Sequence, residues 1–310
     1  MDFAAKRLWF FLISVVVILP GLVFLLPPID GLKAGIDFTG GSAITLQFAD
    51  KVKQENLRAQ LATLGHPDAL VQSLGEDSFF IRTKELDQAT KDRIVEGTEL
   101  ALSPNGVDVL SFDLVAPVVA RETVTAALWA VLAASVGIFL YIWWAFRSVP
   151  SPFRYGVAAI IALVHDTSIV IGIFAILGEV ADMEVNTMFL IALLTVIGYS
   201  VNDTIVVFDR LRENVLLYPG RSLRDVVNLS ISETIGRSLN TSLTLIFTLL
   251  ALILFGGQTI KTFLLVLLIG VVAGTYSSIA VASQVLVAWE HGDFGRFFRR
   301  ILPFRSRARA

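Results

Sequence analysis

The 310-residue sequence predicts an α-helical membrane protein with six transmembrane helices and one small α+β domain between the first two helices. Hydrophobic residues make up 55% of the chain and charged residues 17%, and the mean hydropathy of +0.72 exceeds that of ordinary soluble domains. Six apolar runs are each long enough to cross a hydrocarbon core of ~30 Å as a helix. One long polar segment, 27–121, lies between the first and second runs.

The expected spans are 8–26, 124–145, 154–177, 187–208, 239–256 and 261–288. The first follows two basic residues and so resembles the start of a signal peptide. It is long enough to cross the membrane, however, and Pro27-Pro28 follow it where a signal peptide would have a small-residue cleavage site. We therefore expect residues 1–26 to form a short N-terminus and a retained first helix.

The polar segment has the periodicity of a folded domain, for which we expect the bounds 27–122. Strand and helix spacing predict the order β-α-β-β-α-β, which is the ferredoxin-like pattern. The expected strands are 43–48, 69–74, 78–83 and 107–115, and the expected helices are 54–64 and 87–102. This pattern hosts many unrelated functions, so it does not indicate what the domain does.

The distribution of Lys and Arg predicts the orientation, because these residues are enriched in cytoplasmic loops. Basic residues precede the first span, separate the second from the third and follow the fourth, whereas the loop 178–184 is acidic. Both termini are therefore expected in the cytoplasm and the domain 27–122 outside. The five-helix bundle 123–290 would have a cytoplasmic loop at 209–236 and be followed by a basic cytoplasmic tail, 291–310.

Composition and motifs exclude several kinds of chemistry. The net charge of −2 gives no reason to expect a nucleic-acid partner. The absence of cysteine excludes disulfides and cysteine-based metal or redox sites. Gly40-Gly41 lacks the lysine that follows the glycines of a phosphate-binding loop. We expect no catalytic residue, no metal and no cofactor.

Ionisable side chains inside the spans are the candidate functional groups, because each costs from about 2.5 kcal/mol upward at the centre of a membrane. Helical spacing places a polar stripe on the third, fourth and fifth spans, and we expect these stripes to face one another. A carboxylate beside an arginine in a partly wet interior suits a proton relay, in which protonation of Asp203 would release Arg237. The stripes contain His165 and Asp166, Asn202 and Asp203, and Arg237 and Asn240.

Each of these assignments has a structural alternative. Asn202, Thr241 and Thr244 could serve only as interhelical hydrogen-bonding groups. Arg237 could be an interfacial anchor that belongs to the basic-loop pattern. His165-Asp166 is either a second relay or a satisfied structural pair. Asp203 is the residue for which a purely structural role is hardest to defend.

Small residues at every fourth position predict close helix packing in two spans. The second span carries Ala126, Ala130, Ala134 and Gly137, and the sixth carries Gly270, Gly274 and Ser278. The first span lacks such a pattern and is expected at the edge of the bundle, facing lipid.

Four sequence strings resemble those of the SecF branch of the SecD/SecF protein-export family. They are Gly35-Ile36-Asp37-Phe38-Thr39-Gly40-Gly41-Ser42, Val164-His165-Asp166, the string 198–210 that contains Asn202-Asp203-Thr204, and Arg237-Ser238-Leu239-Asn240-Thr241-Ser242. The resemblance covers the chain except for the basic tail. Within the first string, Gly35, Asp37, Phe38, Gly40 and Gly41 form the family signature of the external domain. The short external segment favours SecF over SecD.

The resemblance implies half of an RND-superfamily bundle that pairs with SecD in the bacterial plasma (inner) membrane. Such a protein uses the proton motive force, without a nucleotide, to promote late movement of unfolded preproteins through SecYEG and to hinder backsliding. YajC, YidC and membrane lipids are further implied partners. By position, Asp203 is the proton-responsive aspartate of the family and Arg237 is its basic partner. The alternatives are a proton-driven small-molecule or lipid exporter of the same superfamily and a non-transporting scaffold subunit.

Overall fold

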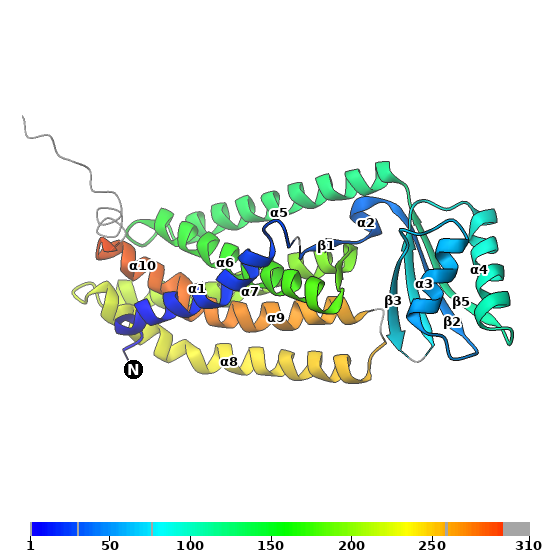
Figure 1. Ribbon diagram of the computed structural model, residues 1–310. Helices are drawn as coiled ribbons and strands as arrows, with labels where there is room; N and C mark the ends of the chain where they lie inside the picture. The colour runs from blue at the N-terminus through cyan, green and yellow to red at the C-terminus, as the bar shows by residue number, and fades with distance from the viewer. Residues whose placement is uncertain (1, 30, 76, 258–259, 294–310) are drawn as a thin grey trace, which may run out of the picture. The chain divides into compact units, whose positions relative to one another are not determined.

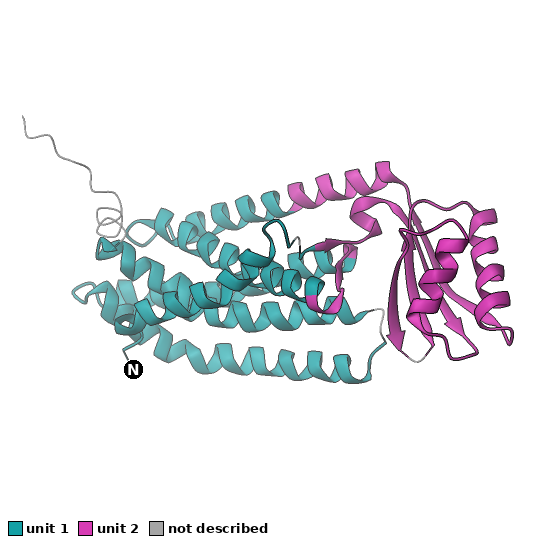
Figure 2. Cartoon of the chain, viewed as in Figure 1, with its two compact units in different colours: residues 1–32, 131–179, 188–310 teal, residues 33–130, 180–187 magenta. Residues whose placement is uncertain are grey.

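The computed structural model describes residues 2–29, 31–75, 77–257 and 260–293 (Figure 1). The chain divides into two compact units, which are described separately (Figure 2). The bundle unit comprises residues 1–32, 131–179 and 188–310, and the sheet unit comprises residues 33–130 and 180–187.

The described residues include six helical segments that are long and apolar enough to cross a membrane, which confirms the six predicted spans. The sixth segment consists of three consecutive elements and contains a π-helical turn, η3. The helices are α1 (Arg7–Phe24), α5 (Pro117–Ala145), α6 (Pro152–Ala181), α7 (Thr187–Leu217), α8 (Leu223–Phe255), α9 (Lys261–Ser277), η3 (Ser278–Ala282) and α10 (Ser283–Glu290). A 3-10 turn, η1 (Ala4–Lys6), precedes α1.

The segment 209–236, predicted to be a loop, is instead mainly helical. Helix α7 continues to Leu217 and α8 begins at Leu223, so the connection is only 218–222. Hydropathy detects the apolar window of a helix, but these helices extend beyond it. Their extensions pack on each other through buried apolar residues and through a hydrogen bond of 3.0 Å from Asn214 Nδ2 to Ser230 Oγ.

The core of the sheet unit is a four-stranded antiparallel sheet that packs against two helices. Its elements are β2 (Gly41–Phe48), α3 (Gln54–Thr63), β3 (Leu70–Gly75), β4 (Ser78–Thr83), α4 (Gln88–Leu102) and β5 (Val107–Val115). The strand order is β3-β4-β2-β5. Alternate residues of β2, including Ile44 and Leu46, are buried against Leu57 and Leu61 of α3 and Ile94 of α4. The two-residue period of the strand and the helical period of α3 thus meet in one core.

The acidic loop 178–184 contributes to a second, two-stranded sheet that the sequence did not predict. Strand β1 (Lys33–Ala34) pairs in parallel with β6 (Glu184–Val185). Between β1 and β2 lies the short helix α2 (Ile36–Thr39). Arg82 of β4 contacts Glu184 at 3.0 Å. Segments distant in sequence therefore join in the sheet unit.

The glycine stripe of the sixth span packs against α7, as its spacing predicts. A Cβ atom added at Gly270 would lie 2.1 Å from Val196 Cγ2, and one at Gly274 would lie 3.0 Å from Ser200 Cβ. Helix α1 also approaches α6 closely, because a Cβ atom at Gly21 would lie 2.4 Å from Gly172 Cα. Glycine permits these contacts because its missing side chain lets the helix backbones come together.

The corresponding stripe of α5 is not packed in this way. Ala126, Ala130 and Gly137 are exposed, and no atom of the described residues lies within 4 Å of a Cβ atom added at Gly137. The prediction that this stripe packs inside the bundle is therefore wrong for this chain. Spacing alone shows that a helix face can be approached closely, but it does not identify the helix that approaches it.

Candidate functional site

Four consecutive residues of the sixth span, Thr275 to Ser278, make polar contacts with four different helices; we call them the 275–278 hub. Successive residues of an α-helix point about 100° apart, because a turn contains 3.6 residues. Four residues in a row therefore cover the whole circumference of the helix. The partners are Ser242 of α8 at 2.6 Å, Phe10 O of α1 at 2.7 Å, Asp166 of α6 at 2.6 Å and Asp203 of α7 at 2.6 Å.

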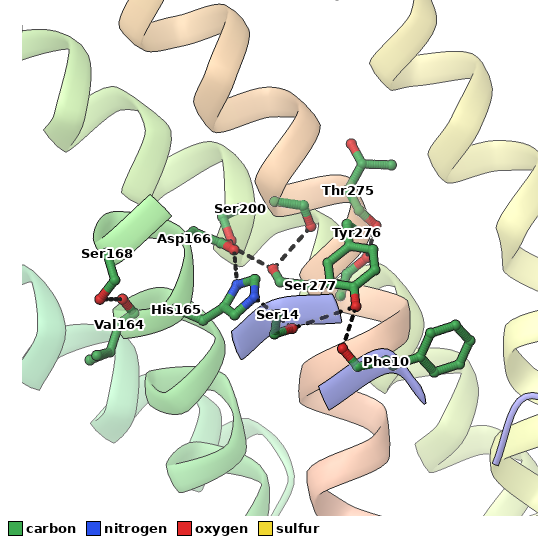
Figure 3. Close-up of polar contacts among 12 residues, drawn as sticks. Phe10, Ser14, Val164, His165, Asp166, Ser168, Ser200, Thr275, Tyr276 and Ser277 are labelled. Atoms are coloured by element: carbon green, nitrogen blue, oxygen red, sulfur yellow. Dashed lines mark hydrogen bonds and ion pairs between the residues drawn. The ribbon is translucent and has the colours of Figure 1, made fainter. Parts of the chain in front are cut away.

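Asp166 has a hydrogen-bond partner at both carboxylate oxygens (Figure 3). Its Oδ2 accepts hydrogen bonds from the Ser277 hydroxyl and from the Ser200 hydroxyl. Its Oδ1 lies 2.9 Å from His165 Nδ1. Only 1% of Asp166 is exposed, so the bundle replaces water with three polar partners.

His165 continues this chain of polar groups to α1. Its Nε2 lies 2.9 Å from Ser14 Oγ, and its ring stacks on that of Tyr276 with centroids 5.9 Å apart (Figure 3). Ser14 and Gly21 are seven residues apart, as are His165 and Gly172, so the polar contact and the close glycine contact lie on one seam between α1 and α6. Small residues bring the backbones together and allow Ser14 to reach the imidazole.

Asp203 faces the sixth span, where Ser278 donates the hydrogen bond to its Oδ2. The carboxylate is buried, with 6% of the residue exposed. Ser278 is also the first residue of η3, and its carbonyl accepts a hydrogen bond of 2.9 Å from Ser283 Oγ. Single π-helical turns inside α-helices are rare and are frequently found at functional sites. Ser278 therefore both bonds to the buried Asp203 carboxylate and begins the segment in which the helix changes from α to π geometry.

Arg237, Asn240 and Asn202 lie elsewhere, with exposed side chains on α8 and α7. Among the described residues, no ion pair joins Arg237 to Asp203. The expected meeting of these two groups is therefore not found in this chain. Asp203 and Asn202 point about 100° apart on one helix, so when Asp203 turns toward the sixth span its neighbour turns outward.

The contacts between α7, α8 and α9 use neutral hydroxyl groups. Tyr199 OH lies 3.0 Å from Ser242 Oγ, which in turn lies 2.6 Å from Thr275 Oγ1. The polar stripes of the predicted spans thus meet only in part. The sequence did not single out Ser277 or Ser200 as functional residues, and Ser278 was predicted only as a small residue of a closely packed helix face. The run Thr275-Tyr276-Ser277-Ser278, interrupting an apolar span, was the signal that could have found the two hub serines.

The five signature residues, Gly35, Asp37, Phe38, Gly40 and Gly41, lie in the sheet unit and make local contacts there. Asp37 Oδ2 accepts a hydrogen bond of 2.7 Å from the backbone N–H of Thr187, the first residue of α7. Gly40 and Gly41 have φ angles of 77° and 124°, and a Cβ atom at Gly41 would lie 2.6 Å from Thr83 O. Gly35 N–H donates to Val185 O at 2.8 Å. Glycine suits positions 40 and 41 because their positive φ angles are unfavourable for other residues, and position 41 also because a side chain would collide with Thr83 O.

Phe38 is the remaining signature residue and is half-buried in α2. Its backbone N–H donates a hydrogen bond of 3.1 Å to Gly35 O, which helps to close the short helix. The structure thus assigns local structural contacts to all five signature residues.

Comparison with known proteins identifies the family. The model of the family described as "Protein export membrane protein SecD/SecF, C-terminal" matches residues 98–292. The chain belongs to the SecD/SecF protein-export family. A protein translocase subunit SecF of Thermobaculum terrenum is 47% identical, with 98% of each chain covered. The SecF subunit of Anaerolinea thermophila is 41% identical, with 97% of each chain covered. The resemblance noted from the sequence strings is therefore confirmed.

A solved member of this family has a similar fold. The crystal structure of SecDF, a translocon-associated membrane protein from Thermus thermophilus, matches with a TM-score of 0.83 and 33% identity. The match covers 94% of this chain and 39% of that chain. SecDF of Bacillus subtilis is 35% identical over 93% of this chain and 38% of its own length. In those relatives, the SecF-like part is joined to further sequence in one longer chain.

Proposed function

We propose that this chain is the SecF subunit of the Sec protein-export machinery. Together with SecD it uses the proton motive force to promote late translocation of unfolded preproteins through SecYEG and to hinder their backsliding. It works as a non-enzymatic transport subunit without a cofactor, and protons are its coupling ion. YajC, YidC and membrane lipids are its further partners in this proposal. Support comes from the SecF and SecDF relatives and from the buried carboxylates of the bundle.

The proposed location is the bacterial inner membrane, with both termini in the cytoplasm and the sheet unit outside as a ferredoxin-like domain. Basic residues concentrated in alternate loops support this orientation. The order β-α-β-β-α-β and the strand order β3-β4-β2-β5 support the domain type. In this proposal the bundle has the half-bundle architecture of the RND superfamily.

The observation that carries the proposal is the hub, where consecutive serines hold two buried carboxylates. Ser277 bonds to Asp166 and Ser278 bonds to Asp203. Protonation of Asp203 removes its negative charge and weakens its charge-assisted hydrogen bond with Ser278. Because Ser278 begins the π-helical turn, a change at Asp203 acts directly on the geometry of the sixth span. His165 and Asp166, whose Nδ1 and Oδ1 atoms lie 2.9 Å apart in the same network, form the candidate second relay of this proposal.

Arg237 has a different proposed role, at the contact with SecD. Its exposed side chain, with those of Asn202 and Asn240, gives α7 and α8 a polar outer face near the level of Asp203. The hydrogen bond between Tyr199 of α7 and Ser242 of α8 shows which parts of the two helices lie side by side. Asp203 and Arg237 are each about one turn away from that hydrogen bond along their own helices. A charged side chain in lipid costs about 2.5–3.5 kcal/mol, so we place SecD over this face. Arg237 and Asp203 then couple through the assembled complex.

The test is preprotein translocation into membrane vesicles, with and without an imposed proton gradient. We expect Asp203→Asn and Arg237→Lys to abolish the gradient-dependent stimulation while the complex remains at normal abundance. Arg212→Lys is the matched control, because Arg212 pairs with Asp209 at 2.6 Å on the same helix as Asp203. This control should retain the stimulation.

Two outcomes would favour the alternative functions. Full stimulation in both Asp203→Asn and Arg237→Lys would make the chain a scaffold subunit with structural polar groups. Unchanged secretion in a strain that lacks the protein would contradict the export function and favour a small-molecule or lipid exporter.

A further inference from the structure

A cavity of about 290 Å³ opens at one end of the bundle unit, where α6 and α8 begin and α7 and α10 end. Its volume is at the lower end of the range of about 300–1,000 Å³ that is typical of small-molecule sites. It is separate from the hub. Its lining includes three charged residues, Arg154, Arg221 and Glu290.

Arg221 distinguishes this cavity, because it has no carboxylate partner among the described residues, whereas five of the eight described arginines of the bundle unit have one. Its guanidinium lies 4.5 Å from the centre of the Tyr218 ring. The paired arginines are Arg7, Arg154, Arg210, Arg212 and Arg224, each within 3.0 Å of an Asp or Glu. Arg221 is thus a lining cation whose charge remains available to a ligand.

The local backbone holds Arg221 at the cavity. Its N–H donates a hydrogen bond of 3.0 Å to Tyr218 O, which closes the turn between α7 and α8. The next residue, Ser222, caps α8 by accepting a hydrogen bond of 3.2 Å from Asp225 N–H. A side chain that leaves a closed turn beside a helix cap loses less freedom on binding than one on a mobile loop.

The remaining charges of the cavity offset one another. Arg154 and Glu290 form an ion pair of 2.7 Å. Two helices begin at the cavity and two end there, so the positive and negative ends of their dipoles are balanced. The net positive charge of the site therefore comes from Arg221, which suits a ligand with a single negative charge.

The apolar lining suggests what the rest of the ligand is. Val215 and Leu223 line the cavity and are half-buried, and the buried Val226 and Leu286 lie behind this apolar surface. Arg154 and Glu290 lie at the ends of the apolar runs 154–177 and 261–288, so this wall of the cavity lies where a bundle in a membrane reaches the headgroup region. A molecule with an anionic head and an apolar body combines both features, and anionic lipids are found at basic pockets of this kind.

We propose that this cavity binds the headgroup of an anionic phospholipid. The phosphate of a singly charged phosphodiester, as in phosphatidylglycerol, pairs with Arg221 beside Tyr218. The glycerol and the upper acyl chains lie against the apolar wall at Val215 and Leu223. This site goes beyond the proposed export function, since neither the hub nor the outer polar face of α7 and α8 takes part.

The experiment uses Trp289 as a local reporter, because the Arg154 guanidinium of the cavity wall lies 5.8 Å from its ring. The purified full chain in complex with SecD is placed in nanodiscs that contain brominated phosphatidylglycerol or brominated phosphatidylcholine, whose bromines quench tryptophan fluorescence on contact. Subtracting the signal of Trp289→Phe isolates the reporter. We expect stronger quenching by phosphatidylglycerol, and a loss of that preference of about fivefold in Arg221→Gln.

The control is Arg147→Gln. Arg147 also lacks a carboxylate partner among the described residues, but it lies over Trp144 and does not line the cavity. This variant should keep the preference, and Arg221→Lys should retain most of it because the charge remains. Equal losses in Arg221→Gln and Arg147→Gln would mean general surface attraction and would overturn the site. Displacement of the lipid by excess inorganic phosphate would show that the cavity takes free phosphate instead.

Discussion

Ser278 Oγ lies 2.6 Å from Asp203 Oδ2, so a buried carboxylate of α7 is held by the first residue of the π-helical turn in the sixth span. The preceding residue, Ser277, holds Asp166 of α6 at the same distance. A single peptide bond therefore links the residues that contact the two buried carboxylates.

Replacing Ser278 with Ala should lower the free energy of unfolding by about 1–3 kcal/mol, because it removes the hydrogen bond to the buried Asp203 carboxylate. Ser168→Ala is the control, since its hydroxyl bonds to Val164 O within the same helix. This control should change stability by less than about 0.5 kcal/mol. Unfolding in mixed micelles, followed by circular dichroism, measures both. Equal stability of the two variants would rule out the Ser278 bond as a significant contributor.

Replacing Gly270 with Ala should destabilise the bundle by about 1–3 kcal/mol, because the new methyl group would collide with Val196. The second substitution Val196→Ala removes the two nearest colliding atoms, Cγ1 and Cγ2, and should restore part of the loss, since Cβ remains at 2.8 Å. Gly198→Ala, on the exposed face of α7 with no atom within 4 Å, is the control and should be neutral or slightly stabilising. The same unfolding assay applies. A lack of rescue in the double variant would argue against direct contact between α9 and α7 at this point.

Replacing Asp37 with Ala should weaken the start of α7 by about 0.5–2 kcal/mol, because the N–H of Thr187 loses its acceptor. Asp37→Asn keeps a side-chain oxygen and should retain most of the stability. Hydrogen exchange at the Thr187 amide measures the effect locally. If the amide exchanged equally slowly in Asp37→Ala and in the unchanged chain, the capping role would be wrong.

Glu184 should give the sheet unit a stability that declines as pH rises. Burial raises the pKa of Glu184 above its usual value of 4.5, although Arg82 and Lys33 act in the opposite direction. The folded state therefore binds the proton more tightly than the unfolded state. The resulting stabilisation is complete below pH 4.5 and is lost as pH rises through the folded-state pKa.

The exchange protection of the Gly35 amide, which bonds to Val185 O at 2.8 Å, reports this effect after correction for intrinsic exchange rates. Protection should fall with rising pH above 4.5 in the unchanged chain and stay nearly constant in Glu184→Gln. Protection that instead increases over this range would mean that the ion pair with Arg82 outweighs burial.

Local sequence patterns placed the main elements because the forces behind them act over short stretches of chain. The apolar runs located the six spans, and the alternation in 43–48 lies within strand β2, at Gly41–Phe48. The stripe Gly270, Gly274 and Ser278 also indicated correctly that the sixth span has a closely approached face. In each case the signal depends on composition or on the spacing along one element.

Patterns that depend on a second element were less informative. Hydropathy ended α7 too early, because the helical extension to Leu217 is stabilised by packing on α8. The acidic loop 178–184 gave no sign of the strand beside it, since the two-residue strands β1 and β6 form only by pairing with each other. The stripe on α5 was identified, but its expected packing inside the bundle was not found.

By itself, the sequence predicted six spans, the resemblance to the SecD/SecF family and the placement of Asp166 and Asp203 inside spans. Only the tertiary structure decided what those carboxylates contact. The rotation of α7 turns Asp203 toward Ser278 and leaves Asn202 exposed, while α8 leaves Arg237 exposed. Helical spacing fixes the angles between residues on one helix, whereas the rotation of each helix follows from side-chain packing against all its neighbours.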